Sequence, residues 1–153
     1  MAWTLLLAAG QGNRLASATG GLAKQFLDWK GAPLYWESAL VFSRCARVEG
    51  LVFVFPEACI DEERERVAGL MRNASLGIPW KVVAGGALRQ DSVRNGLSAL
   101  PDDCMEVLIH DAARPFVSPV LVNRILDGLH GEASGECVAA CIPGIPVVDT
   151  IKV

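Results

Sequence analysis

A glycine-rich segment near the start of the chain has the residue types needed to hold a phosphate. The segment LAAGQGNRL spans residues 7–15 and directly follows an apolar run. Gly10 and Gly12 let the backbone approach an anion closely, and exposed amides in such a loop can cradle it. The small side chains of Ala8 and Ala9 leave room for a flat base or a ribose. From glycine spacing alone, an ordinary strand-to-helix turn with a surface arginine is the favoured interpretation, and the segment matches neither GxGxxG nor the GxxxxGK[ST] phosphate loop.

Two cations follow in the same part of the chain. Arg14 carries a permanent charge, and its planar fork matches phosphate oxygens. Lys24, in AKQFL, is expected at the edge of the same loop, where it could fold over the anion that Arg14 contacts. A solvated surface lysine is the alternative at that position.

A second cluster, GGALRQDSVRNGL at residues 85–97, joins an apolar run to a segment of helical period. Gly85 and Gly86 directly follow the apolar run. Asp91 and Ser92 then fall in the first turn, where Asp91 fits a helix cap and Ser92 could offer its hydroxyl to a base edge. Arg89 is expected to brace the loop rather than to contact a ligand.

The third cluster is HDAARPF, at residues 110–116. Asp111 stands at the end of an apolar run and is followed by Ala112 and another alanine, an arrangement suited to holding Mg²⁺ or a ribose hydroxyl. Arg114 is expected to pair with Asp111 or another carboxylate and to fix the turn. His110 is interpreted as a packing residue.

Apolar runs alternate with helical segments along the chain, and this alternation predicts an α/β fold. A parallel sheet with crossover helices gives a three-layer α/β/α sandwich of Rossmann-like type, with ligands bound at the carboxyl ends of the strands. All three clusters fall at such ends. Strands are expected at 3–8, 50–55, 81–84, 106–109 and 136–141, and helices at 33–45, 61–71, 90–100 and, after a Ser118 cap, 119–129.

Composition narrows the class of protein. The 153 residues fit one domain, and the formal net charge of −3 argues against a nucleic-acid-binding surface. Five cysteines without a CxxC pair indicate neither a disulfide framework nor a zinc site. The run TLLLAAG is too short to span a membrane and lacks the basic flank of a signal peptide, so a cytoplasmic location is expected.

Taken together, LAAGQGNRL, AKQFL, GG-x-x-R-x-x-SV-x-x-GL and HDAARPF, in this order, resemble the methylerythritol phosphate cytidylyltransferases of the non-mevalonate isoprenoid pathway. The resemblance extends from Thr4 to Lys152. It implies the fold of the nucleotide-diphospho-sugar transferases, CTP and a polyol phosphate as substrates, Mg²⁺ as cofactor, and a homodimer at full length.

The resemblance also implies a role for individual residues. Arg14 and Lys24 would stabilise the transition state, and Asp111 would lie beside the ribose and the metal. Arg114 and Thr150, the latter in VVDTIK, would contact the polyol phosphate. The cytidine site would be lined by Ala8, Ala9, Gly10, Gly12, Gly86, Ser92 and Ala112.

The chain departs from the family pattern in three places. The stretch ASATGGLA before Lys24 is longer than usual, and Ala23 replaces a common proline. Family chains exceed two hundred residues, so residues 1–153 are expected to be a cytidylyltransferase domain that lacks its last elements and its dimerisation arm. A parent fused to a second pathway enzyme is one possibility.

Three other functions compete with this interpretation. Ribitol-5-phosphate cytidylyltransferases share the fold and the nucleotide loops, and an inactive nucleotide-binding fragment would keep them too. A dinucleotide-binding oxidoreductase does not fit, because the glycine spacing is wrong and Phe55-Pro56 stands where an acidic residue is needed.

Overall fold

The computed structural model describes residues 1–10, 22–131, 135 and 138–144. Two compact units make up the chain, residues 1–117 and residues 118–153. Among the described residues, no helix combines the length and apolar character that a membrane span requires.

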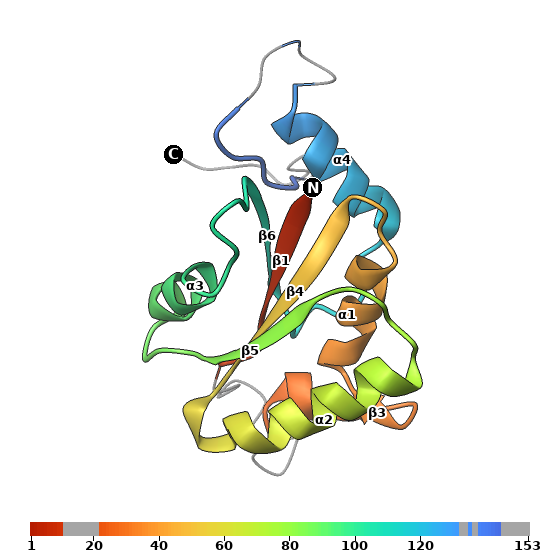
Figure 1. Ribbon diagram of the computed structural model, residues 1–153, viewed down its shortest axis with the longest axis vertical. Coiled ribbons are helices and arrows are strands. Elements are labelled where there is room, and N and C mark those ends of the chain that lie inside the picture. Colours follow the sequence, from red (N-terminus) through yellow and green to blue (C-terminus); the bar gives the residue numbers. More distant parts are fainter. Residues whose placement is uncertain (11–21, 132–134, 136–137, 145–153) are drawn as a thin grey trace, which may run out of the picture. The chain divides into compact units, whose positions relative to one another are not determined.

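A parallel sheet forms the centre of the first unit (Figure 1). In the described part of the chain it has four strands in the order β5-β4-β1-β6. Their bounds are β1 Ala2–Leu7, β4 Val48–Phe55, β5 Trp80–Ala84 and β6 Glu106–Asp111. At the carboxyl edge, Leu7 pairs with Val54 on one side and with Asp111 on the other. The register therefore brings the loops that follow β1 and β6 side by side.

Side chains alternate between the two faces of this sheet, and both faces are apolar. Trp3, Leu5 and Leu7 form one cluster with Val52 and Val54. On the other face, Phe53 and Phe55 stack on each other and pack against the buried ring of Tyr35. Burial on both faces is why these strands read as continuous apolar runs.

Helices cover the two faces and complete the layers (Figure 1). On the Leu5 face lies α3, where a Cβ at Gly96 would come within 2.9 Å of Leu5 Cδ1. On the opposite face, α1 supplies Tyr35, whose hydroxyl donates a 2.7 Å hydrogen bond to Glu63 of α2. The helices are α1 Tyr35–Ser43, α2 Ile60–Asn73 and α3 Arg89–Leu97. The predicted α/β/α sandwich is thereby confirmed.

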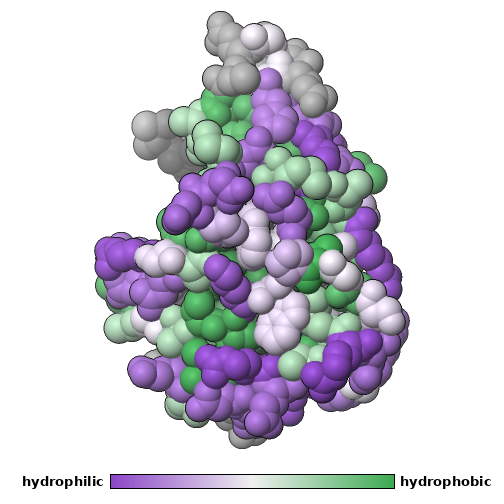
Figure 2. Space-filling view, viewed as in Figure 1, coloured by the Kyte–Doolittle hydropathy of each residue, from purple (hydrophilic) through white to green (hydrophobic). Residues whose placement is uncertain are grey.

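The solvent face of α2 carries most of the charge of this helix. Its exposed residues include Asp61, Glu62, Arg64, Glu65 and Arg66. Figure 2 shows this face as a hydrophilic band at the foot of the view. Glu63 differs from its neighbours in being only 3% exposed. Its carboxylate also accepts a hydrogen bond from Arg66, which together with Tyr35 satisfies the buried charge.

A hairpin replaces the expected first turn of the helix at 33–45. Strands β2 Asp28–Trp29 and β3 Ala32–Pro33 pair antiparallel, so Pro33 belongs to a strand and α1 begins at Tyr35. Lys30 and Gly31 connect the strands with φ values of 56° and 83°. Two successive positive φ values are typical of a type I′ turn, and glycine at the second position makes the turn accessible. The short helix η1, Lys24–Phe26, precedes this hairpin. A second short helix, η2 Glu57–Cys59, lies between β4 and α2.

The second unit contains helix α4, Pro119–Leu129. The predicted cap is confirmed, because Ser118 Oγ accepts from the Leu121 amide at 3.2 Å. The expected strand at 136–141 is wrong for its described part, since residues 138–141 have no regular secondary structure. Val138 is the one β-branched residue among these four, and alanine, which fills the next two positions, is depleted in strands.

Candidate functional site

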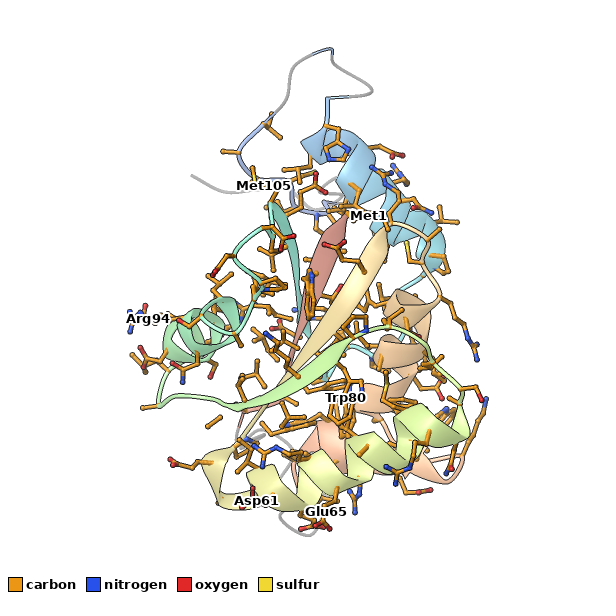
Figure 3. The ribbon with its side chains drawn as sticks, in the orientation of Figure 1. Met1, Asp61, Glu65, Trp80, Arg94 and Met105 are labelled. Carbon is orange, nitrogen blue, oxygen red and sulfur yellow. The ribbon has the colours of Figure 1, made fainter. Side chains whose placement is uncertain are left out.

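A hollow of about 380 Å³ opens at the carboxyl edge of the sheet. Its walls come from the segments that follow β1, β5 and β6, and from Gln25 of η1. Figure 3 labels Met1 and Met105 at the opposite, amino ends of β1 and β6, and Arg94 projecting outward from α3. Six of the predicted site residues line the hollow: Ala9, Gly10, Gly86, Ser92, Asp111 and Arg114.

The loop after β1 presents backbone amides on one side of the hollow. Ala8 is buried and extends the sheet, because its N–H donates to Val54 O at 2.8 Å. The N–H groups of Ala9 and Gly10 have no acceptor among the described residues. A Cβ built on Gly10 would meet nothing within 4 Å, so open space borders the loop here. Gly12 and Arg14 lie outside the described residues, so their predicted roles stay predictions.

Gln25 holds this loop in place, and sequence reasoning missed it. Its side chain is 3% exposed, and Nε2 donates to Ala8 O and to Gly10 O, each at 2.7 Å. Lys24 precedes it as the first residue of η1 and has no ion-pair partner in the described part of the chain. The motif AKQFL contained the only signal, a glutamine directly after the predicted lysine.

The loop after β5 packs tightly on the loop after β1. A Cβ at Gly85 would lie 2.3 Å from Ala9 Cβ and 2.9 Å from Ser92 Oγ. Larger side chains at either Gly85 or Ala9 would therefore separate the two loops. This contact explains why both predicted clusters are rich in small residues.

Ser92 uses its hydroxyl within the protein. Its Oγ accepts from the Gly86 N–H at 3.1 Å and donates to Leu88 O at 3.3 Å, and the residue is 4% exposed. Asp91 acts as the predicted cap, because its Oδ2 accepts from the Leu88 amide at 3.1 Å. Ser92 and Gly86 both line the hollow, and a contact of either with a base stays a prediction.

Asp111 lies between two guanidinium groups. Arg89 Nε and Nη2 approach its Oδ1 at 3.1 and 2.9 Å, and Arg114 Nε lies 3.8 Å from its Oδ2. The expected pairing of Arg114 with Asp111 is confirmed, and Arg89 braces the loop as predicted by joining the β5 and β6 segments. The Asp111 side chain is 39% exposed, so solvent screens these pairs and their net contribution to stability is small. The carboxylate therefore remains accessible to a competing cation.

His110, the residue before Asp111, packs on the opposite face of the sheet. Because side chains alternate along a strand, His110 faces α1 while Asp111 faces the hollow. His110 Nε2 lies 3.0 Å from Arg114 O and 3.1 Å from Ser38 Oγ, and the ring packs edge-on against Phe42. Burial lowers the pKa of His110, more than the Arg114 carbonyl and the Asp111 charge raise it. The predicted packing role is confirmed.

Ala112 is fully buried and donates its N–H to Leu7 O at 3.0 Å, which closes the β6 segment onto β1. Ala113, the next residue, lines the hollow. Thr150 lies outside the described residues.

Comparison with known proteins assigns the chain to a family. The sequence profile of the 2-C-methyl-D-erythritol 4-phosphate cytidylyltransferases matches residues 2–153. The chain belongs to this family.

Two curated cytidylyltransferase relatives and one solved structure agree with this assignment. The bifunctional enzyme IspD/IspF of Oleidesulfovibrio alaskensis is 53% identical over 99% of this chain and 37% of its own length. The 2-C-methyl-D-erythritol 4-phosphate cytidylyltransferase of Clostridium botulinum is 37% identical over 97% of this chain and 59% of its own length. The structure of 4-diphosphocytidyl-2C-methyl-D-erythritol synthase from Anaerococcus prevotii superposes with a TM-score of 0.66 at 22% identity. It covers 84% of this chain and 50% of that one, and it supports the fold.

The chain spans less than two thirds of the length of these curated cytidylyltransferases.

Proposed function

We propose that the protein transfers the cytidylyl group of CTP to 2-C-methyl-D-erythritol 4-phosphate and releases pyrophosphate, a step in isoprenoid precursor biosynthesis. The observation that carries the proposal is the family match over residues 2–153, together with the hollow at the three predicted clusters. Ribitol 5-phosphate is not favoured as the acceptor, because the family and the Clostridium botulinum relative are named for the methylerythritol reaction.

The nucleotide would occupy the hollow with its base against the small residues of the first two loops. Ala9 and Gly86 line it from the β1 and β5 sides, and the amides of Ala9 and Gly10, which have no acceptor among the described residues, suit a phosphate. Ala8, Gly12, Ser92 and Ala112 complete the proposed cytidine site, and Asp111 would contact the ribose.

Mg²⁺ is the proposed cofactor, and the described residues fit it as a metal that arrives with the nucleotide. They contain no group of three or more His, Cys, Asp or Glu side chains that could hold a metal alone. Mg²⁺ commonly binds through one or two carboxylates plus substrate phosphates, and Asp111 supplies one accessible carboxylate. When bound, the ion would neutralise charge on the phosphates.

The reaction is an attack of the acceptor phosphate oxygen on the α-phosphorus of CTP. The new O–P bond forms as the bond to the β-phosphate breaks, and pyrophosphate leaves. Such a transfer needs positioning and charge stabilisation and no covalent intermediate. Arg14 and Lys24 would oppose the negative charge that gathers on the α-phosphoryl oxygens. Each such contact is worth roughly 3–4 kcal/mol, or about 10²–10³ in rate.

The acceptor would bind beside Asp111, where Arg114 lines the hollow with an 81% exposed side chain. Arg114 and Thr150 are the proposed contacts to the polyol phosphate. An exposed guanidinium suits this role because its fork can bind phosphate oxygens in pairs.

The parent protein would be a bifunctional fusion, as the relatives at 53–55% identity are. Residues 1–153 would then be the nucleotide-binding part of its cytidylyltransferase domain. A homodimer in the cytoplasm is the proposed working form, on the basis of the family resemblance. Light scattering on the purified full-length protein measures the subunit number.

Pyrophosphate release by the full-length protein tests the proposal. We expect release from CTP with 2-C-methyl-D-erythritol 4-phosphate and Mg²⁺, and little with ribitol 5-phosphate. Equal or greater release with ribitol 5-phosphate would reassign the acceptor, and no release with either would refute the transferase function.

A further inference from the structure

Gln25 makes a contact that goes beyond ordinary packing. It is buried, and its two amide hydrogens are shared between two carbonyls 17 and 15 residues earlier in the chain, Ala8 O and Gly10 O. Both distances are 2.7 Å, at the short end for N–H···O hydrogen bonds. An amide oxygen facing two carbonyl oxygens would be repelled, so this side-chain orientation is the one that chemistry allows.

The two bonds supply donors to carbonyl groups in the segment that follows β1, where the chain leaves the sheet. The Ala8 N–H still belongs to the sheet, since it donates to Val54 O, but the loop leaves the sheet after this residue. The buried carbonyl of Ala8 needs a donor, and Gln25 provides it; the same amide group also donates to Gly10 O, which belongs to an exposed residue. In a planar trans peptide the C=O and the next N–H point in opposite directions. Holding Ala8 O towards Gln25 therefore turns the Ala9 N–H away from it.

The same contact fixes the short helix that carries Lys24. Gln25 is the middle residue of η1, and Phe26 on its other side packs against Tyr35 and Phe55 at ring-centroid distances of 6.2 and 6.0 Å. The helix is thus attached to the core through Phe26 and to the loop through Gln25. No other hydrogen bond joins η1 to the loop among the described residues.

We infer that Gln25 is a positioning residue that clips Lys24 and the amides of the β1 loop into one rigid unit around the nucleotide phosphates. The inference rests on the proposed function for the role of Lys24. Without the clip, Lys24 would keep its charge and lose its defined distance from the reacting phosphorus.

Two variants of the full-length protein test the clip. Gln25→Met keeps the length of the side chain and removes both donors, and Gln25→Glu places a charge against both carbonyls. We expect kcat to fall by about 10²-fold, the cost of misplacing a catalytic group by about 1 Å. Because a general loss of structure would also lower kcat, the decisive readout is a double-mutant cycle with Lys24→Ala. In that background Gln25→Met should change kcat by less than about 3-fold, since residues that act as a unit are not additive. The full loss in both backgrounds would overturn the inference.

A second readout does not depend on catalysis. Hydrogen exchange of the Ala8 amide, which donates to Val54 O, and of the Phe26 amide, which donates to Ala23 O, should accelerate in Gln25→Met. The matched control is Tyr35→Phe, which removes another buried side-chain hydrogen bond at 2.7 Å and keeps the ring that packs on Phe26. It should leave this exchange and kcat unchanged. Unchanged exchange in Gln25→Met would refute the clip, whereas an inactive wild-type protein with accelerated exchange in Gln25→Met would refute the proposed function and leave the clip standing.

Discussion

Gly85 is the position where a single methyl group tests the contact between the β1 and β5 loops. In Gly85→Ala the new Cβ would lie 2.3 Å from Ala9 Cβ. Carbon atoms in contact are normally about 3.5–4.0 Å apart, so the two loops must separate by more than about 1 Å. Neither atom can rotate away, because both are attached directly to the backbone. The substitution also pushes on Ser92 Oγ at 2.9 Å, which holds the Gly86 amide.

We expect the free energy of unfolding to fall by about 1–3 kcal/mol, the usual cost of overpacking. A displacement of about 1 Å in the loops should also lower kcat/KM for CTP by about 10²-fold. Urea denaturation measures the first quantity and pyrophosphate-release kinetics the second. The matched control is Gly69→Ala in α2, where the new Cβ meets nothing within 4 Å and should stabilise the helix by about 0.4–1 kcal/mol. If Gly85→Ala keeps normal kcat/KM for CTP, the two loops do not form one nucleotide site.

Four further outcomes are expected. In the full-length protein, Arg14→Ala and Lys24→Ala should each lower kcat by about 10²–10³ and change the calorimetric Kd for CTP much less, because their charge acts on the transition state; normal turnover in Lys24→Ala would remove it from the mechanism. Arg89→Ala should tighten Mn²⁺ binding in the presence of CTP, measured by titration calorimetry, since Arg89 competes for Asp111; weaker binding would mean that Arg89 holds the nucleotide. CTP, at 100 times its Kd and with Mg²⁺ present, should stabilise the fold by about 2.7 kcal/mol, measured as a rise of the melting temperature in a thermal-shift assay. ATP and NAD should change the melting temperature little. The lowered pKa of His110 should add stability at high pH that is lost as pH falls below about 6.5, because the unfolded state then binds the extra proton; pH-dependent denaturation of His110→Gln should lack this contribution.

The fold was predictable because its two central strands, β1 and β4, are buried on both faces. Continuous apolar runs such as the one ending at Phe55 could be recognised without any knowledge of their partners. The first and last residues of individual helices and strands were harder to predict from the sequence. Pro33 looks like the first turn of a helix in sequence, and only the pairing with Asp28 across the positive-φ turn makes it a strand residue. The residues from Val138 onwards also form an apolar run and were therefore predicted to be a strand. Strand formation, however, depends on a neighbouring strand that the sequence does not reveal.

The candidate site was partly predictable for a related reason. Parallel strands end at one edge, so clusters that follow strands converge, and Asp111 and Gly86 do line one hollow. Contacts between clusters were not predictable, because they depend on register and loop path. Arg89 was expected to brace its loop, yet nothing in the sequence identified Asp111 as its partner. The two hydrogen bonds of Gln25 likewise join residues that no periodicity connects.

A structure of the full-length protein with CTP and Mg²⁺ tests the central claim most directly. We expect the cytosine to lie against Ala9 and Gly86, and the phosphates to lie along the amides of Ala9 and Gly10, within reach of Lys24. Asp111 should exchange its contact with Arg89 for the metal. A nucleotide bound away from the carboxyl edge of β1, β5 and β6 would contradict the account.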